Sequence, residues 1–219
     1  MSTIATENRA KFTTRPHSGR TWGFRFRGLL GALAMIACGV PALLSPPLAA
    51  EGTWGAACAD AIGWAIFLAA AAFRFWPTLY IGGKKTYQLI DQGPYSVCRN
   101  PLYLGTFLLW LSAAFFFKSV TIGLGAVLGV VFYLLITLPA EEQHLAEVLG
   151  EPYLDYCRRV PRLWPNWSLF RTPATVEVTI VGLVMEARRA ARWLCLPLVA
   201  EIVAQLRTES WWHCLFNLP

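Results

Sequence analysis

Charged residues are scarce in this chain of 219 residues, since only 15% of them are Asp, Glu, Lys or Arg. A soluble globular domain usually carries about 25% charged residues, so this shortage argues against a soluble protein. Histidine is scarcer still, with three in the chain. Three histidines are too few for the histidine clusters of a membrane di-iron enzyme, so a desaturase or hydroxylase is not expected.

Cysteine pairs of the metal-binding kind are also missing. The six cysteines form no Cys-x-x-Cys pair and show no spacing typical of a metal site. We therefore interpret them as small apolar residues. His144 is interpreted as a polar residue of a short helix. Neither a metal site nor a nucleic-acid partner is expected.

Apolar residues are abundant instead, at 56% of the chain. They gather in four runs, at residues 28–50, 54–73, 101–117 and 120–139. Each run is close to the ~20 residues that a helix needs to cross ~30 Å of hydrocarbon. Backbone groups in lipid need internal partners, which favours helices. The sequence predicts an all-α fold, a polytopic membrane helical bundle with about four transmembrane helices plus amphipathic cytoplasmic helices.

The composition divides the chain into four parts. Residues 1–27 form a basic N-terminal segment, 28–80 the first two membrane helices, 81–165 a core with polar motifs, and 166–219 an amphipathic C-terminal extension. The first apolar run could also be a signal peptide, because Leu48-Ala49-Ala50 resembles a cleavage site. The long basic leader favours a retained helix.

Basic residues set the expected orientation. With the N-terminus in the cytoplasm, Glu51 and Lys118 are the only charges in the two outer loops. Lys84, Lys85 and Arg99 then fall on the cytoplasmic side, which is a positive-inside pattern.

Two amphipathic segments follow the fourth apolar run. Residues 141–149 predict a short helix that ends at Gly150. Residues 174–206 are apolar but carry six charges, which makes a fifth crossing improbable. We predict an interfacial helix there, with Arg188 and Arg192 one turn apart and facing lipid head groups.

The third and fourth runs predict a hairpin, because only Lys118-Ser119 separate them. The hairpin returns Glu141 and Glu142 to the membrane face where Arg99 begins the third run, since a helix rises 1.5 Å per residue. We expect a cluster of opposite charges at the cytoplasmic ends of these two helices.

The segment before the third run has the features of a binding loop. Gly93-Pro94 is a turn signal. Asn100 stands where a helix N-cap belongs and Pro101 at the first helical position. The first helix amides and Arg99 would then form a site for an anion.

A carboxylate from the hairpin could face this anion site. Glu141 or Glu142 would hold a cationic group, so a small zwitterion matches the arrangement. The same residues also fit an anchoring arginine, an ordinary helix cap and acidic residues that offset a helix dipole. Spacing alone does not separate the two interpretations.

Two linked motifs carry a resemblance to a known family. GPYSVCRNPLYLG at 93–105 and EEQHLAEVLGEPYLDYCRRVPR at 141–162 resemble the isoprenylcysteine carboxyl methyltransferase and phospholipid N-methyltransferase superfamily of integral membrane methyltransferases. The resemblance covers about residues 81–165. Asn100 stands where the family usually has His, and Leu149 where it often has Phe.

The resemblance implies an enzyme that binds S-adenosyl-L-methionine at the cytoplasmic membrane face. A lipophilic acceptor from the bilayer, such as a prenylcysteine-like carboxylate or a phospholipid amine, would take the methyl group. The implied cofactor-binding residues are Gly93, Tyr95, Arg99, Asn100, Pro101, Tyr103, Glu141 and Glu142. The implied catalytic residues are Arg99, Glu142 and Arg162. One of the two glutamates would accept the proton of an amine acceptor, and Arg159 or Arg162 would steer an anionic acceptor.

Other interpretations stay open. Asn100 cannot titrate near neutral pH, so it replaces the family His only if that His positions the cofactor rather than carrying a proton. Sterol reductases share a similar Arg–Pro–Tyr pattern, which allows an NADPH-dependent membrane reductase. A non-catalytic membrane partner protein, with the basic tail as its contact surface, is the third possibility.

Overall fold

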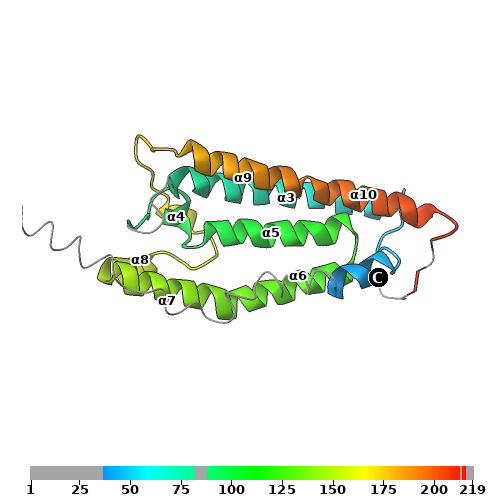
Figure 1. Cartoon of the computed structure of the whole chain (residues 1–219), viewed down its shortest axis with the longest axis horizontal. Coiled ribbons are helices and arrows are strands. Elements are labelled where there is room, and N and C mark those ends of the chain that lie inside the picture. Colours follow the sequence, from blue (N-terminus) through cyan, green and yellow to red (C-terminus); the bar gives the residue numbers. More distant parts are fainter. Residues whose placement is uncertain (1–36, 82–87, 213, 216–219) are drawn as a thin grey trace, which may run out of the picture.

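The computed structural model describes residues 37–81, 88–212 and 214–215 of the chain. Regular structure in these residues is helical throughout, without a strand among them, so the predicted all-α class is confirmed. The helices are α3 (Trp54–Ile81), α4 (Pro94–Val97), α5 (Pro101–Phe116), α6 (Val120–Phe132), α7 (Leu138–Leu149), α8 (Glu151–Arg159), α9 (Ile180–Trp193) and α10 (Cys195–Thr208). A π-helical turn, η1 (Tyr133–Thr137), joins α6 to α7, and a 3-10 turn, η2 (Trp167–Leu169), follows α8. The long helices lie along one axis (Figure 1).

Within the described part of the chain, two helices are long and apolar enough to cross a membrane. These are α3, with 28 residues, and the continuous helix Val120–Leu149, with 30 residues. The helix α5 has 16 residues, about 24 Å at 1.5 Å per residue, which is shorter than the hydrocarbon core of a bilayer. The predicted total of four transmembrane helices is not confirmed. The basic segment 1–27 and residues 28–36 of the first apolar run lie outside the described residues.

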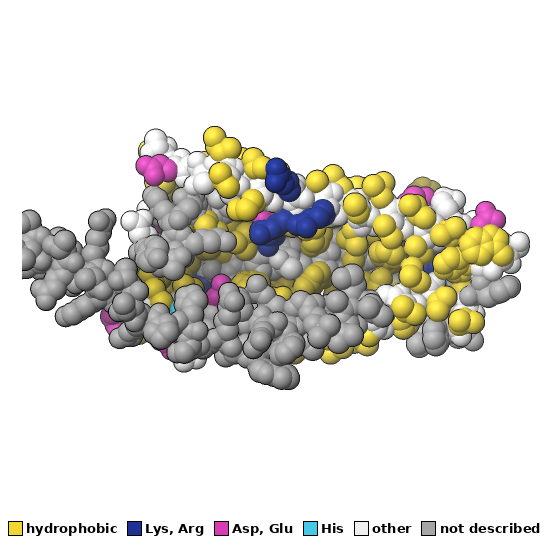
Figure 2. Space-filling view, viewed as in Figure 1, with side chains coloured by type: hydrophobic (Ala, Val, Ile, Leu, Met, Phe, Trp, Pro, Cys, Tyr) yellow, Lys and Arg dark blue, Asp and Glu magenta, His cyan; other side chains and the backbone are white. Residues whose placement is uncertain are grey.

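The helix α6 exposes a row of apolar side chains in the described structure. The described structure buries no residue of this helix. Leu124 and Leu128 are 58% and 60% exposed, and Leu135 in η1 is 71% exposed. Hydrophobic side chains dominate the described surface in the view of Figure 2. Soluble monomers rarely expose a continuous apolar face of this kind, so the protein is membrane-associated.

The helices α3 and α5 pack closely through small residues. A Cβ atom added to Gly63 would lie 3.0 Å from the ring of Phe116. One added to Gly105 would lie 2.8 Å from Cγ of Arg74 and 3.0 Å from the backbone of Phe73. Glycine lets two membrane helices approach until their backbones and side-chain stems touch. These contacts fix α5, whose first residues carry the binding-loop motif, against α3.

A charged cluster closes the turn between α5 and α6, which we call the Lys118 end of the bundle. Lys118 has φ 48°, and Ser119 caps α6 by accepting a hydrogen bond from the Ile122 amide. The ammonium group of Lys118 pairs with Glu51 at 3.1 Å and with Asp60 at 3.0 Å. The predicted hairpin turn is confirmed, and the two charges expected in the outer loops contact each other.

The C-terminal helices correct one prediction. Residues 174–206 were predicted to form an interfacial helix, but α9 packs along α3 and α10 packs against α5 (Figure 1). The chain therefore runs from the end of the bundle near α4 back to the Lys118 end. The reason lies in Glu186, which is 2% exposed and pairs with both Arg74 and Arg189. A charge that is costly alone in an apolar environment becomes tolerable when paired.

Candidate functional site

The binding loop begins with a glycine that no other residue could replace without strain. Gly93 has φ 59°, and a Cβ atom there would overlap the ring of Tyr80. Its amide donates to the carbonyl of Arg171 at 2.7 Å, and its carbonyl accepts from the Ser96 hydroxyl at 2.7 Å. Gly93 is buried, so its part in the site is to shape the loop that leads to α5. Its predicted role in cofactor binding stays a prediction.

The start of α5 differs from the expected helix cap in one respect. Asn100 is the N-cap residue and Pro101 follows it in the first turn, as predicted, but the Asn100 side chain makes no capping hydrogen bond. Its amide nitrogen donates instead to Oε1 of Glu142 at 3.2 Å and to the carbonyl of Arg162 at 3.1 Å. Asn100 thus joins α5 to the two other segments of the site. The amides of Tyr103 and Leu104 are already bonded to the Asn100 carbonyl, which leaves fewer helix amides for an anion than predicted.

Glu142 is the centre of the polar cluster. Its carboxylate pairs with Nη1 of Arg99 at 3.3 Å and with Nη2 of Arg162 at 2.6 Å. Nε of Arg162 adds a hydrogen bond of 3.1 Å. The predicted return of the two glutamates to the helix end that carries Arg99 is confirmed, but the neighbour of Arg99 is Glu142 and not Glu141, the expected one. The carboxylate is only 11% exposed and is surrounded by donors, so this geometry favours a carboxylate that positions the two arginines.

Glu141 points to a different partner. Tyr103 donates to its Oε2 at 2.5 Å, whereas Glu142 contacts the arginines. Neighbouring helical residues diverge by about 100°, so this division was predicted. Unlike Glu142, Glu141 is exposed. Of the two predicted carboxylates, Glu141 is therefore the one that an incoming group could reach.

The π-helical turn explains how α7 presents these carboxylates. Pro139 lies in the first turn of α7, directly after η1. Proline has no amide hydrogen, so it interrupts the hydrogen bonds of the preceding turn, and a wider π turn accommodates it. Within η1, the ring of Tyr133 packs against Tyr103 at 5.7 Å and Trp110 at 5.4 Å between ring centres. These contacts hold α7 and α5 together just before Glu141.

Buried tyrosines pack against the binding loop that precedes α5. The hydroxyl of Tyr156 donates to the carbonyl of Tyr95 at 2.7 Å. Tyr153, Tyr156 and Val160 form a buried cluster that includes the side of α8 facing the loop. Burial raises the pKa of Tyr95, Tyr153 and Tyr156 far above the ordinary value for tyrosine. All three therefore remain neutral, and Tyr156 serves as a structural hydrogen-bond donor.

Cys98 lies within the motif but is not a nucleophile. It is completely buried. Burial raises the pKa of its thiol from an ordinary 9.0 to about 12, although a hydrogen bond from the Asn100 backbone acts in the opposite direction. Because the thiolate is the reactive form, a thiol with this pKa is inert near neutral pH. The structure assigns Cys98 to packing, as the sequence predicted.

An open cavity of about 790 Å³ adjoins the cluster. It is lined by Arg99, Cys157, Arg158, Arg159, Val160, Pro161, Trp164, Pro165, Asn166, Trp167 and Ser168. Its size is within the range of small-molecule and cofactor sites. Arg99 contributes to both the cavity and the cluster, and its Nε is buried without an acceptor among the described residues. A buried donor of this kind needs a partner, which an anionic ligand group would supply.

Most of the cavity residues were not predicted as site residues. The sequence indicated Arg159 only as a residue that could steer an acceptor, and it interpreted Trp164 and Trp167 as membrane-interface residues. The structure places Trp164 on the cavity wall with 80% of its surface exposed, while Trp167 stacks on Trp76 at 5.9 Å. The sequence feature that could have indicated this cavity wall is the basic pair Arg158-Arg159, which is followed by Trp164 and Trp167.

Comparisons with known proteins agree with the geometry of the two motifs. A family described as phospholipid methyltransferase matches residues 52–152. The chain belongs to this family. The match covers α3, α5, α6 and α7 and therefore includes the Arg99–Glu142 pair. The family is part of the membrane methyltransferase superfamily that the sequence motifs resemble.

Two curated relatives have other names. The nickel-cobalt-cadmium resistance protein NccN of Alcaligenes xylosoxydans xylosoxydans is 31% identical over 170 residues, which are 77% of this chain and 79% of that protein. The cobalt-zinc-cadmium resistance protein CzcN of Cupriavidus metallidurans is 31% identical over 153 residues, 69% of each chain. No solved structure matches the chain significantly. Within the described residues, no group of three or more His, Cys, Asp or Glu side chains is placed to hold a metal ion.

Proposed function

We propose that the protein transfers a methyl group from S-adenosyl-L-methionine to a lipophilic acceptor at the cytoplasmic membrane face. The observation that carries this proposal is the cluster of Arg99, Asn100, Glu142 and Arg162 beside an open cavity. These residues come from both motifs of a methyltransferase family, and the chain brings them together at one end of the bundle.

The cavity fits the chemical groups of this cofactor. Arg99 and Arg159 line it, so the carboxylate of an amino acid could pair with a guanidinium group. The Nε of Arg99 has no acceptor among residues 37–81, 88–212 and 214–215, which supports a role of Arg99 as the carboxylate ligand. Trp164 offers an exposed aromatic face on which a purine ring could stack. When bound, the cofactor supplies an electrophilic methyl group on sulfur, with a neutral thioether as the leaving group.

The chain's own residues would position the reactants and exclude water. Glu142 fixes Arg99 and Arg162 and is a positioning residue, because its oxygens are occupied by their donors and by Asn100. Glu141 is exposed and would accept the proton that an amine acceptor must lose before its lone pair can attack. A carboxylate acceptor needs no base at neutral pH. Arg162, 42% exposed, would attract an anionic acceptor to the site.

The position of the site also supports an acceptor that arrives from the bilayer. The cluster joins the first turn of α5 to α7, and α7 continues an exposed apolar helix. Positive residues near this end, Arg158, Arg159 and Arg162, match the cytoplasmic side under the positive-inside rule. We therefore propose that this end, with the site, faces the cytoplasm.

Cofactor binding tests the proposal. Isothermal titration of the purified full-length chain should show binding of S-adenosyl-L-methionine and of its demethylated product, and none of NADPH. Arg99→Gln should weaken this binding about tenfold or more, because it removes a charge-assisted pair. Glu201→Gln, on the exposed surface of α10, is the matched control and should bind as the wild type does. Binding of NADPH instead would support the reductase interpretation, and binding of neither would support a non-catalytic partner protein.

A further inference from the structure

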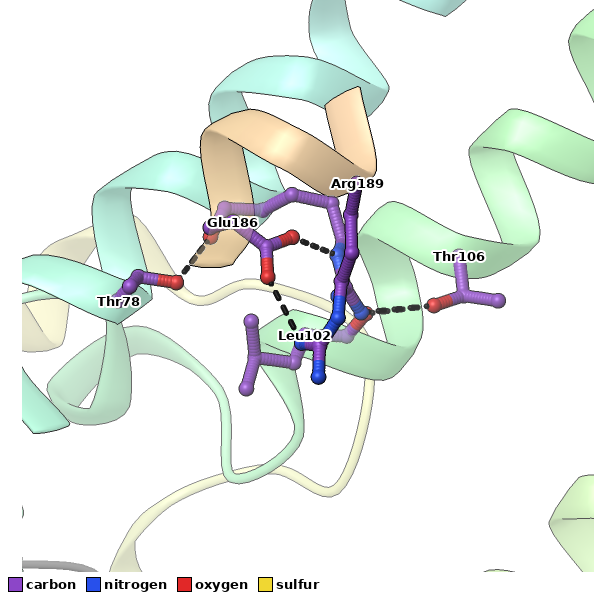
Figure 3. Close-up of polar contacts among 6 residues, drawn as sticks. Thr78, Leu102, Thr106, Glu186 and Arg189 are labelled. Carbon is purple, nitrogen blue, oxygen red and sulfur yellow. Dashed lines mark hydrogen bonds and ion pairs between the residues drawn. The ribbon is translucent and has the colours of Figure 1, made fainter. Parts of the chain in front are cut away.

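A second group of charges lies on another face of α5, away from Glu142. Glu186 of α9 pairs with both Arg74 and Arg189, and Figure 3 shows its contact with Arg189. Arg74 donates to Glu186 at 2.7 Å and to the Thr106 hydroxyl at 3.2 Å. Arg189 donates to the other oxygen of Glu186 at 3.0 Å. One buried carboxylate thus pairs with two arginines and holds α9 against α3.

Two more arginines on α9 have no counter-charge in the part of the chain that the structure describes. Arg188 and Arg192, which we call the arginine pair, are exposed, and neither forms an ion pair or hydrogen bond with any described residue. They are four residues apart, so they lie one above the other on one helix face. Among the described residues, Glu186 is the one carboxylate that pairs with any of the four arginines Arg74, Arg188, Arg189 and Arg192, so this region has an excess of positive charge.

Apolar side chains surround the arginine pair. Val181, Val184 and Met185 occupy the same helix face at spacings of three, four and seven residues and are 66%, 43% and 50% exposed. Figure 2 shows basic side chains over α9 among hydrophobic ones. An unpaired arginine on a surface that faces lipid is costly, and an anion beside it removes that cost.

The arginine pair lies beyond Glu186 on α9, further from the polar end of the bundle than the Arg74–Glu186 contact. Arg74 contacts the Leu102 carbonyl and Thr106, in the first two turns of α5. Arg99 directly precedes that helix and belongs to the polar end of the bundle. Arg188 and Arg192 lie two and six residues further from that end than Glu186, which is about 3 and 9 Å at 1.5 Å per residue, and long helical side chains lean back toward the helix N-terminus, here toward the polar end. A guanidinium there can reach the head-group layer while its stem lies on apolar surface.

We propose that the arginine pair binds the phosphate of an anionic phospholipid. The phosphate accepts hydrogen bonds from both guanidinium groups, and the acyl chains lie over the exposed side chains of α9. Arg189, oriented by Glu186, adds positive charge beside the site. Anionic lipid is favoured over zwitterionic lipid because only its head group leaves a net negative charge to offset the excess of arginine. The proposal requires a protein embedded in lipid but not methyl transfer, so each can fail without the other.

Short-chain lipids test the proposal on the full-length chain in a non-ionic detergent. Dioctanoyl phosphatidylglycerol and dioctanoyl phosphatidylcholine are titrated separately, and thermophoresis gives the dissociation constants. We expect tighter binding of phosphatidylglycerol. The double variant R188Q/R192Q should weaken that binding about 25-fold, at about fivefold for each arginine, and should leave phosphatidylcholine binding unchanged.

The control is the double variant R9Q/R15Q, which removes the same charge from the basic segment 1–27. It should leave phosphatidylglycerol binding near the wild-type value. Equal losses in the two double variants would show non-specific attraction and overturn the site. Equal affinity for the two lipids, or for inorganic phosphate and phosphatidylglycerol, would overturn it as well. If R188Q/R192Q loses helix content by circular dichroism, the single variants Arg188→Gln and Arg192→Gln decide the matter, and no loss in either refutes the proposal.

Discussion

Replacing Glu142 by glutamine tests how the polar cluster is held together. The carboxylate is 11% exposed and contacts Arg99 at 3.3 Å and Arg162 at 2.6 Å. Glutamine keeps the volume but removes the charge, which leaves two guanidinium groups close to each other without a counterion. Removal of one partner from a fully buried ion pair costs about 3–5 kcal/mol. Because Arg162 is 42% exposed and retains contact with water, we expect Glu142→Gln to lower the free energy of unfolding by about 2–3 kcal/mol.

Unfolding in mixed micelles measures this loss. The purified chain is titrated with dodecyl sulfate, and helix content is followed by circular dichroism. Arg158→Gln, which removes a guanidinium that is 69% exposed, is the control and should change stability by less than about 0.5 kcal/mol. The double variant Glu142→Gln/Arg162→Gln should recover part of the loss, since it relieves the repulsion between the arginines. Wild-type stability of Glu142→Gln would refute the central role of this carboxylate.

Three further predictions concern the binding loop. Gly93→Ala should lower the free energy of unfolding by about 1–3 kcal/mol. The loss should exceed that of Gly52→Ala, because Gly52 has a similar φ of 77° but no neighbour within 4 Å. Equal losses in the two variants would show that the contact between Gly93 and Tyr80 is unimportant. Iodoacetamide near neutral pH should modify exposed Cys214 in detergent and spare Cys98. Mass spectrometry of the modified peptides checks this difference. The neutral Cys98 thiol should stabilise the fold below pH 9.0, its ordinary pKa, and this contribution should be lost as the pH rises toward about 12, the pKa in the folded protein. Unfolding curves measured against pH check this second expectation. Asn100→His should bind S-adenosyl-L-methionine at least as tightly as the wild type, because imidazole can replace the amide as a donor to Glu142; weaker binding by calorimetry would contradict the positioning role of Asn100.

Much of the candidate site was predictable because it depends on helix length. Two apolar runs joined by a two-residue turn must return Glu141 and Glu142 to the end where Arg99 begins. The structure confirms this return, with Glu142 as the residue that contacts Arg99. The direction of the Asn100 side chain was not predictable, because its choice between the helix amides and Glu142 depends on a residue 42 positions away. The residues next to Asn100 in the sequence indicate only the first option, a hydrogen bond to the helix amides.

The C-terminal helices were mispredicted for a related reason. A hydropathy profile treats the charge of Glu186 as unfavourable for a helix that packs along the bundle. In the structure, Arg74, 112 residues earlier in the chain, pairs with Glu186. Such pairs are invisible to any window of neighbouring residues. The cavity was missed because loop residues 160–168 form much of its wall, and no periodic pattern indicates how an irregular segment folds over a helix end.

Methyl transfer itself provides the most direct test of the account. Membranes that contain the full-length chain are incubated with S-adenosyl-L-methionine labelled in its methyl group, and the lipid, protein and small-isoprenoid fractions are counted. The account predicts label in a lipophilic product with the wild-type chain and loss of nearly all of it with Arg99→Gln. Label no higher than in membranes without the protein, from a chain that is folded and embedded, would contradict it.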